Sequence, residues 1–164
     1  MEYLNCKTKQ LESIGGFYTA KEICKVQELS DGNVICAYDS FLGFRHGPKA
    51  IINEATVIAY LLSNNYHANK YELDLIRSVN ETSKEHKSIA IGSNYDPLEL
   101  QINLPILLPD SICNIPEEFL PVIYLLPAQI IGFFKSMNLG LSPDSPSNSG
   151  TITRVVQGVT IYEE

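Results

Sequence analysis

ATVIAYLLS, residues 55–63, is a continuous apolar run of the length of one β-strand. Such a run is typical of a strand that is covered on both faces, as in a parallel sheet. VICAY (residues 34–38) and SIAIG (residues 88–92) have the same character. These three runs predict the centre of a buried sheet, and the rest of the fold follows from what lies between them.

Helical patterns separate the apolar runs. Tyr18–Leu29 and Glu72–Thr82 place apolar side chains at helical spacing beside charged ones. Leu120–Met137 predicts a long apolar helix, which Pro127 should kink or restart because proline removes a backbone donor. Two further strands are indicated more weakly. One is Tyr3–Cys6, and the other is broken at Pro105 into Gln101–Leu104 and Ile106–Leu108.

Strands that alternate with helices predict an α/β fold with a parallel sheet and helices on both faces. The length of 164 residues indicates one domain. Ligands of such folds bind at the carboxyl ends of the strands. The residues that directly follow each strand are therefore the first candidates for a site.

The charge balance excludes some classes of partner. Lys and Arg number 12 and Asp and Glu 19, which gives a formal net charge of -7. A net acidic chain is a poor binder of polyanions, so we expect no nucleic-acid partner and no anionic membrane surface. A small basic site for one phosphate group is compatible with this charge.

The cysteine pattern and the apolar segments bear on location. The four cysteines show no C-x-x-C spacing, which predicts no zinc or redox site. Charged residues interrupt the first part of the chain, where a signal peptide would be apolar. We therefore expect a cytoplasmic protein with reduced thiols. Phe119–Phe134 is shorter than the roughly 20 residues of a spanning helix, and it predicts either a core helix or a subunit or domain interface.

The segment DSFLGFRHGPK, residues 39–49, follows a predicted strand. Pro48 suits the first position of a helix, with Gly47 as its cap. His46 would then face the positive end of that helix, which favours a neutral imidazole that can move a proton to or from a sugar hydroxyl. Arg45 and Lys49 carry charge suited to a phosphate. The alternative is a capped turn with solvent-facing basic residues.

Lys25 and Glu28 lie three residues apart and share a helix face. They are either a surface ion pair or a carboxylate that moves a proton between adjacent sugar carbons, oriented by its lysine neighbour. The other acidic candidates are expected to be solvated: Glu12, Glu22, Glu117 and Glu118. The stretch of residues 13–16, Ser-Ile-Gly-Gly, is too short for a phosphate cradle of P-loop type.

Four motifs resemble one family in their order along the chain. They are GFRHGPK (residues 43–49), YELDL (71–75), LGLSPD (139–144) and RVVQGVTIY (154–162). The family is that of the tagatose-6-phosphate ketose/aldose isomerases, also described as galactosamine-6-phosphate deaminases, which contain two sugar-isomerase (SIS) domains. The chain resembles the second SIS domain, residues 1–141, followed by a C-terminal tail, residues 142–164.

The resemblance implies a flavodoxin-like SIS domain that binds phosphosugars without a metal or organic cofactor. Glu28 would move the proton between C1 and C2, with Lys25 one turn before it. His46 would open the sugar ring and would be contributed across a subunit interface. Arg154 and Gln157 fall in the tail, which closes over the substrate in such enzymes.

The chain also departs from the family that it resembles. Members are more than twice as long, and their first SIS domain supplies most of a Ser/Thr loop for the phosphate. Three hypotheses follow: a sugar-phosphate isomerase or deaminase, a non-catalytic phosphosugar-binding or assembly module, and an inactive remnant. The expected partners are a phosphosugar and either further copies of the chain or a separate first SIS domain.

Overall fold

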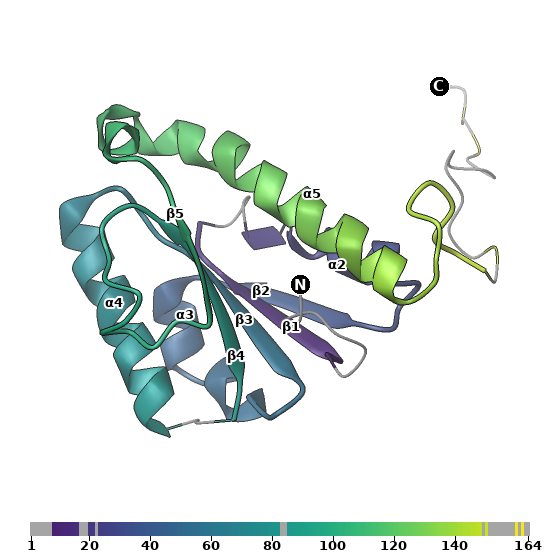
Figure 1. Cartoon of the computed structure of the whole chain (residues 1–164), viewed down its shortest axis with the longest axis horizontal. Coiled ribbons are helices and arrows are strands. Elements are labelled where there is room, and N and C mark those ends of the chain that lie inside the picture. Colours follow the sequence, from purple (N-terminus) through teal and green to yellow (C-terminus); the bar gives the residue numbers. More distant parts are fainter. Residues whose placement is uncertain are drawn as a thin grey trace.

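A computed structural model describes residues 8–16, 20–21, 23–82, 85–148, 150, 160 and 162. Its centre is a five-stranded sheet in the order β2-β1-β3-β4-β5, and every adjacent pair is parallel (Figure 1). The strands are β1 (Gln10–Ile14), β2 (Ile35–Asp39), β3 (Thr56–Leu61), β4 (Lys87–Gly92) and β5 (Leu104–Leu107). This strand order is the flavodoxin-like one, so the predicted fold class is confirmed.

Helices cover both faces of the sheet, as predicted (Figure 1). In the described residues they include α2 (Lys25–Leu29), α3 (Phe41–Arg45), α4 (Tyr66–Thr82) and α5 (Leu120–Asn138), with the short 3-10 turns η2 (Pro48–Ile51), η3 (Asp110–Asn114) and η4 (Glu117–Phe119). On one face, Val26 of α2 and Ile131 of α5 share a buried apolar cluster with the strands. On the other, Phe44 of α3 and Ile76 of α4 do the same.

The centre of the sheet is where the sequence predicts best. All six residues of β3 are buried, and β4 is buried after its first residue. The two strands pair with each other in the middle of the domain. A continuous apolar run is a reliable strand signal here because both of its faces meet helices.

The outer strand β2 differs from its prediction. VICAY was expected to be covered on both faces, but β2 lies at the edge of the sheet, and Ile35 and Tyr38 are 68% and 40% exposed. Part of the run is nevertheless covered, since Val34 is fully buried and Cys36 packs against the same apolar cluster.

The strand beside β2 was missed. β1 is central in the sheet, although Gln10, Glu12 and Ser13 break its apolar pattern. The weaker prediction of a strand at Tyr3–Cys6 lies outside the described residues.

Two prolines lie within regular elements, Pro105 in β5 and Pro127 in α5. Pro105 lies within β5 and pairs in register with Ala90 without breaking the strand. An edge strand tolerates proline because one of its sides makes no ladder hydrogen bonds. Pro127 lies inside α5, which continues as one helix from Leu120 to Asn138. The predicted restart of the helix at Pro127 is therefore wrong.

The long helix α5 packs on the sheet with one side only. Among the described residues, the segment Glu117–Asn138 is long and apolar enough to span a membrane by length and composition alone. Tyr124 and Ala128 belong nevertheless to the buried cluster over the sheet. Lys135 is fully buried, and its Nζ donates to the carbonyl oxygen of Thr8 (3.3 Å). The predicted core helix is thus confirmed for this side of α5.

Candidate functional site at the carboxyl edge of the sheet

The chain reverses its direction of winding between β1 and β3, and ligands of such sheets bind at this point. Gly15 and Gly16 directly follow β1. A Cβ atom on Gly15 would lie 2.7 Å from the Cβ of Leu61 and 3.1 Å from its carbonyl oxygen, so only glycine fits. A Cβ on Gly16 would meet nothing within 4 Å. This stretch was considered only as a phosphate cradle of P-loop type, for which it is too short, so the close packing of Gly15 against Leu61 was not predicted.

Ser63, just after β3, is the centre of a polar cluster at the same edge. Its N–H donates to Oε2 of Glu72 (2.8 Å), and its hydroxyl donates to Oε1 of Glu117. The buried amide of Asn69 donates to the carbonyl oxygen of Ser63 (3.3 Å). The loop after β3 is thereby held to α4 on one side and to η4 on the other.

Glu72 is an unusual group in this cluster because it is nearly buried, at 9% exposure. Burial raises the pKa of its carboxyl to about 7, the Ser63 N–H lowers it, and the nearby Glu117 carboxylate raises it again. The expectation that Glu117 is merely solvated is therefore incomplete, since it pairs with Ser63 although it lies at the surface.

Glu12 is a clear correction to the sequence prediction. It was expected to be solvated, yet it lies in the central strand β1 and is 2% exposed. Burial raises the pKa of its carboxyl, the hydrogen bond from Gln10 (2.9 Å) lowers it, and the Asp39 carboxylate raises it. Glu22 lies outside the described residues.

The predicted pair of Lys25 and Glu28 is present on α2. Nζ of Lys25 lies 3.0 Å and 3.3 Å from the two carboxylate oxygens of Glu28. Both side chains are about half exposed, at 55% and 54%. The carboxylate is thus oriented by its lysine neighbour and is open to a ligand, as the proton-transfer hypothesis requires.

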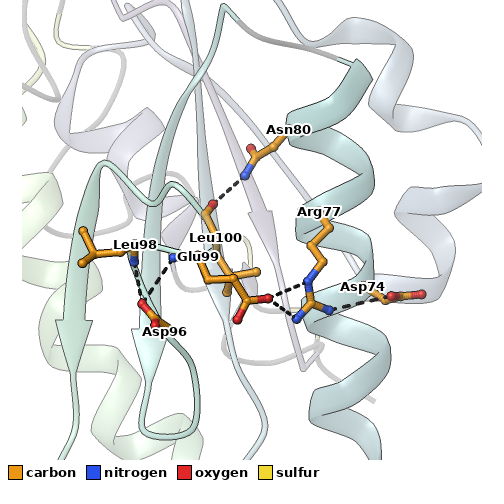
Figure 2. A network of polar contacts seen from close by, with 7 residues as sticks. All are labelled: Asp74, Arg77, Asn80, Asp96, Leu98, Glu99 and Leu100. Carbon is orange, nitrogen blue, oxygen red and sulfur yellow. Dashed lines mark hydrogen bonds and ion pairs between the residues drawn. The ribbon is translucent and has the colours of Figure 1, made fainter.

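Arg45 is engaged with α4. Its Nη2 donates to the carbonyl oxygen of Tyr71 (3.1 Å) and lies 3.7 Å from Asp74. Asp74 also lies 3.8 Å from Arg77, whose guanidinium donates to Glu99 (2.7 Å), as Figure 2 shows. These charges connect α3, α4 and the loop before β5. Arg45 therefore has a structural role that its spacing did not reveal.

His46 ends α3 and is exposed, with its N–H donating to the carbonyl oxygen of Gly43 (3.1 Å). Gly47 and Pro48 begin the next turn as predicted, and Lys49 lies half-buried within it. That turn, η2, is a four-residue 3-10 turn. The helix that was expected to begin at Pro48 is therefore a single 3-10 turn. Its cap, Gly47, directly follows His46, the residue that caps the C-terminal end of α3.

The predicted site residues fall into two groups that this chain keeps apart. Lys25 and Glu28 lie on the α2 and α5 face of the sheet, whereas the segment from Arg45 to Lys49 lies on the α3 and α4 face (Figure 1). Arg154 and Gln157 lie outside the described residues. Within this chain, Glu28 and His46 therefore lie on elements that cover opposite faces of the sheet.

The chain is similar to several known proteins. D-galactosamine-6-phosphate deaminase of Escherichia coli is 34% identical over 140 residues, which are 84% of this chain and 35% of that protein. A solved structure assigned to a tagatose-6-phosphate ketose/aldose isomerase of Clostridium novyi matches with a TM-score of 0.84 at 35% identity, over 98% of this chain and 43% of that one. The tagatose-6-phosphate ketose/aldose isomerase of E. coli matches with a TM-score of 0.73 at 25% identity, over 95% and 43%. No protein-family model matches.

The chain belongs to the sugar-isomerase (SIS) domain family. The likeness extends over nearly the whole described fold, and the resemblance inferred from the four motifs is confirmed. The SIS domain spans 35% of the length of the curated relative. The larger part of that relative has no counterpart in this chain.

The described residues of the SIS domain contain no group of three or more His, Cys, Asp or Glu side chains that could hold a metal ion. Cys24, Cys36 and Cys113 are free thiols. The hydrogen bond with Cys24 raises the pKa of the Cys36 thiol most, and burial raises it further. Cys113 accepts from the Asn94 amide (3.2 Å) at the carboxyl edge of the sheet.

A hollow of about 770 Å³ lies away from this edge. It is lined by the last turns of α4, the start of β4 and the residues before β5, and both signs of charge are present in Arg77 and Glu99. Because these two already form an ion pair (Figure 2), the hollow shows no charge preference for a phosphate. The candidate site therefore stays at the carboxyl edge and on α2.

Proposed function

We propose that this SIS domain acts on an amino-sugar or ketose 6-phosphate of the galactosamine 6-phosphate or tagatose 6-phosphate type. The proposal is carried by the likeness to a galactosamine-6-phosphate deaminase over 84% of the chain. The exposed Lys25–Glu28 pair supports it, because an oriented and accessible carboxylate can transfer a proton between neighbouring carbons. The activity belongs to the cytoplasm, where sugar phosphates are metabolised.

In the proposed reaction Glu28 removes the proton from C2 of the open-chain aldose and returns a proton to C1. A 2-amino aldose thereby becomes a ketose imine at C2, and addition of water releases ammonia and leaves the ketose 6-phosphate. Lys25 directs the carboxylate at the substrate through the ion pair between them. His46, supplied by another subunit, opens the sugar ring. No metal or organic cofactor is needed for these proton transfers.

The tail of residues 142–164 is proposed to close over the bound sugar, with Arg154 and Gln157 on the substrate. The described residues at the start of the tail contact the loop that follows α2, the helix that carries Glu28. The N–H of Asn148 donates to Oδ2 of Asp31 (3.3 Å), in the loop that follows α2.

The test is the release of ammonia and the formation of tagatose 6-phosphate from galactosamine 6-phosphate by the purified chain. His46→Asn should lower turnover strongly, whereas the matched control His67→Asn, at an exposed histidine on α4, should not. Equal activity of both variants would refute the role of His46. No turnover by the wild type would refute the activity of this chain alone.

A second candidate function is a binding or assembly module without catalysis. The observation that favours it is the separation of Glu28 and His46 on opposite faces of the sheet, in a chain that spans 35% of its curated relative. Calorimetric titration with tagatose 6-phosphate separates the hypotheses. Binding without turnover supports the module, and neither binding nor turnover supports an inactive remnant.

A further inference from the structure

Cys24 and Cys36 come from different elements, and the fold places their thiols side by side. Cys24 caps the start of α2, and Cys36 lies in the edge strand β2. The two thiols share a hydrogen bond. A C-x-x-C spacing marks only cysteines that are close in sequence, so the spacing in this chain could not reveal the pair.

Gln27 holds the two cysteines in this arrangement. Its backbone N–H donates to the carbonyl oxygen of Cys24 (2.9 Å), and its side-chain Oε1 accepts from the N–H of Cys36 (3.2 Å). The backbones of both cysteines are thus tied to one residue of α2. The contact between the thiols is therefore fixed by hydrogen bonds of the main chain as well as by the sulfur atoms.

Both thiols are half-buried. The Sγ of Cys24 donates to the carbonyl oxygen of Ala20 (3.9 Å), and Cys36 packs against the apolar cluster beneath α2 and α5. Reactive cysteines are typically found in partly exposed surroundings of this kind, whereas fully buried ones are inert. A small oxidant can therefore reach the pair.

The two thiols differ in reactivity. The hydrogen bond from Cys36 lowers the pKa of the Cys24 thiol, and burial opposes this effect. The same hydrogen bond, and then burial, raise the pKa of the Cys36 thiol. Because the thiolate is the nucleophile, Cys24 is the member of the pair that reacts first.

We propose that Cys24 is an oxidation site for peroxide and that it forms a reversible disulfide with Cys36, which links α2 to β2. In a reducing compartment disulfides are usually transient and sense oxidants, so both thiols are reduced in the resting state. The inference goes beyond the proposed function, and the disulfide itself does not depend on turnover.

The oxidation consumes one peroxide molecule and removes two electrons from the pair of thiols. The Cys24 thiolate attacks a peroxide oxygen, the O–O bond breaks, and the hydroxide that leaves takes up the proton of the thiol to form water. The sulfur of Cys36 then attacks the sulfenic acid on Cys24. The S–S bond forms, the S–O bond breaks, and the hydroxyl leaves with the Cys36 proton as a second water. A dithiol reductant restores both thiols by two exchange steps and is itself oxidised to a disulfide.

The disulfide would move the start of α2. Bonded sulfur atoms lie about 2 Å apart, which is closer than two thiols joined by a hydrogen bond. Cys24 directly precedes Lys25, whose Nζ lies 3.0 Å from the Glu28 carboxylate. Drawing Cys24 toward β2 therefore displaces the carboxylate that is proposed to transfer the proton. This consequence rests on the proposed function, and oxidation should lower turnover at least ~10-fold, because a displacement of about 1 Å can lower a rate ~100-fold.

Peptide mapping of the purified chain tests the disulfide. Trypsin cleaves after Lys25 and so places the two cysteines on separate peptides. After treatment with hydrogen peroxide and blocking of the remaining thiols, we expect the peptide that ends at Lys25 to be joined to the peptide of residues 26–45. Dithiothreitol should separate them. In a Cys6→Ser/Cys113→Ser chain, which keeps two of the four cysteines, peroxide should remove both titratable thiols and dithiothreitol should restore both.

Two single variants separate the roles of the thiols. In Cys36→Ala the sulfenic acid on Cys24 loses its partner, so dimedone should label Cys24 at least ~10-fold more than in the wild type. The matched control is Cys113→Ala, at an exposed thiol that accepts from the Asn94 amide, and this variant should keep the cross-link. Circular dichroism verifies that both variants are folded, and the mapping of the wild type stands without them.

Several results would overturn the disulfide. They are wild-type peptides that stay separate after peroxide, dimedone on Cys36 instead of Cys24, loss of the cross-link in Cys113→Ala, and a bond between two chains on a non-reducing gel. Ammonia release by reduced and oxidised samples keeps the two proposals apart. A cross-linked chain without turnover in either state contradicts only the proposed function, whereas full turnover after oxidation contradicts only the displacement of the carboxylate.

Discussion

Glu28 and Glu72 show one side-chain type in two contrasting regions of the molecule. Glu28 lies on the surface of α2, half exposed and paired with Lys25 at 3.0 Å. Glu72 is nearly buried beneath the loop after β3, where it accepts from the Ser63 N–H and lies near the Glu117 carboxylate. An accessible and oriented carboxylate suits chemistry, whereas a buried one suits the fold. Changes at the first should alter activity alone, and changes around the second should alter stability.

The largest expected effect is on turnover. Glu28→Gln removes the proton-transferring group but keeps the size of the side chain, so kcat should fall by at least ~100-fold. The free energy of unfolding should change by less than about 1 kcal/mol because the ion pair with Lys25 is exposed. Steady-state kinetics and urea unfolding of the same preparation measure both quantities. An unchanged kcat would remove the distinction between the two carboxylates.

The next effect concerns the packing at the edge that holds Ser63. Gly15→Ala would place a Cβ 2.7 Å from the Cβ of Leu61, which is fixed to the backbone of β3. We expect a loss of about 2–3 kcal/mol in the free energy of unfolding. Gly16→Ala is the matched control, since its Cβ meets nothing within 4 Å and should change stability by under ~1 kcal/mol. Equal losses in the two variants would show that backbone freedom, not close packing, is what these glycines supply.

The fold could be predicted where apolar patterning and burial coincide. β3 and β4 were recognised because helices cover both of their faces. β1 was missed because Glu12 and Ser13 are buried in it despite their polarity, which no pattern of apolar residues reveals. For β2 the error was the opposite one: its apolar residues predicted burial on both faces, yet Ile35 is exposed at the edge of the sheet.

The candidate site divides in the same manner. The pairing of Lys25 with Glu28 could be predicted because side chains three positions apart on a helix lie next to each other. The contacts of Ser63 could not, since its hydroxyl partner Glu117 is 54 residues away in sequence and belongs to another element. Arg45 was linked to a phosphate by its charge alone, while the carboxylate of Asp74 that it meets comes from α4.

An effect of comparable size should separate the two carboxylates by pH. The pKa of Glu72 is about 7 in the folded chain and near 4.5 when unfolded, so the folded state retains a proton that the unfolded state loses between these values. The free energy of unfolding of the wild type therefore falls as the pH rises through this window. Glu72→Gln cannot ionise, and its stability relative to the wild type should improve by about 3 kcal/mol from pH 4.5 to pH 8.

Urea unfolding at both pH values measures this difference. Glu28→Gln is the control, because its exposed ion pair should give a small change at either pH. A Glu72→Gln variant with the same relative stability at pH 4.5 and pH 8 would show that the Glu72 carboxyl does not carry the pH dependence.

The smallest expected effect decides whether the loop after β3 is purely structural. The hydroxyl of Ser63 accepts from the N–H of Asn65 (3.0 Å) and donates to Glu117, so Ser63→Ala should cost about 1 kcal/mol in the free energy of unfolding. Ser93→Ala is the control after β4, where the hydroxyl lies 3.5 Å from the Cys113 sulfur in an exposed contact and its loss should cost less. If Ser63→Ala instead raised KM for the sugar phosphate and left stability unchanged, the region around Glu72 would belong to the binding site. Glu28 and Glu72 would then differ in which part of the sugar phosphate each region contacts, not in activity against stability.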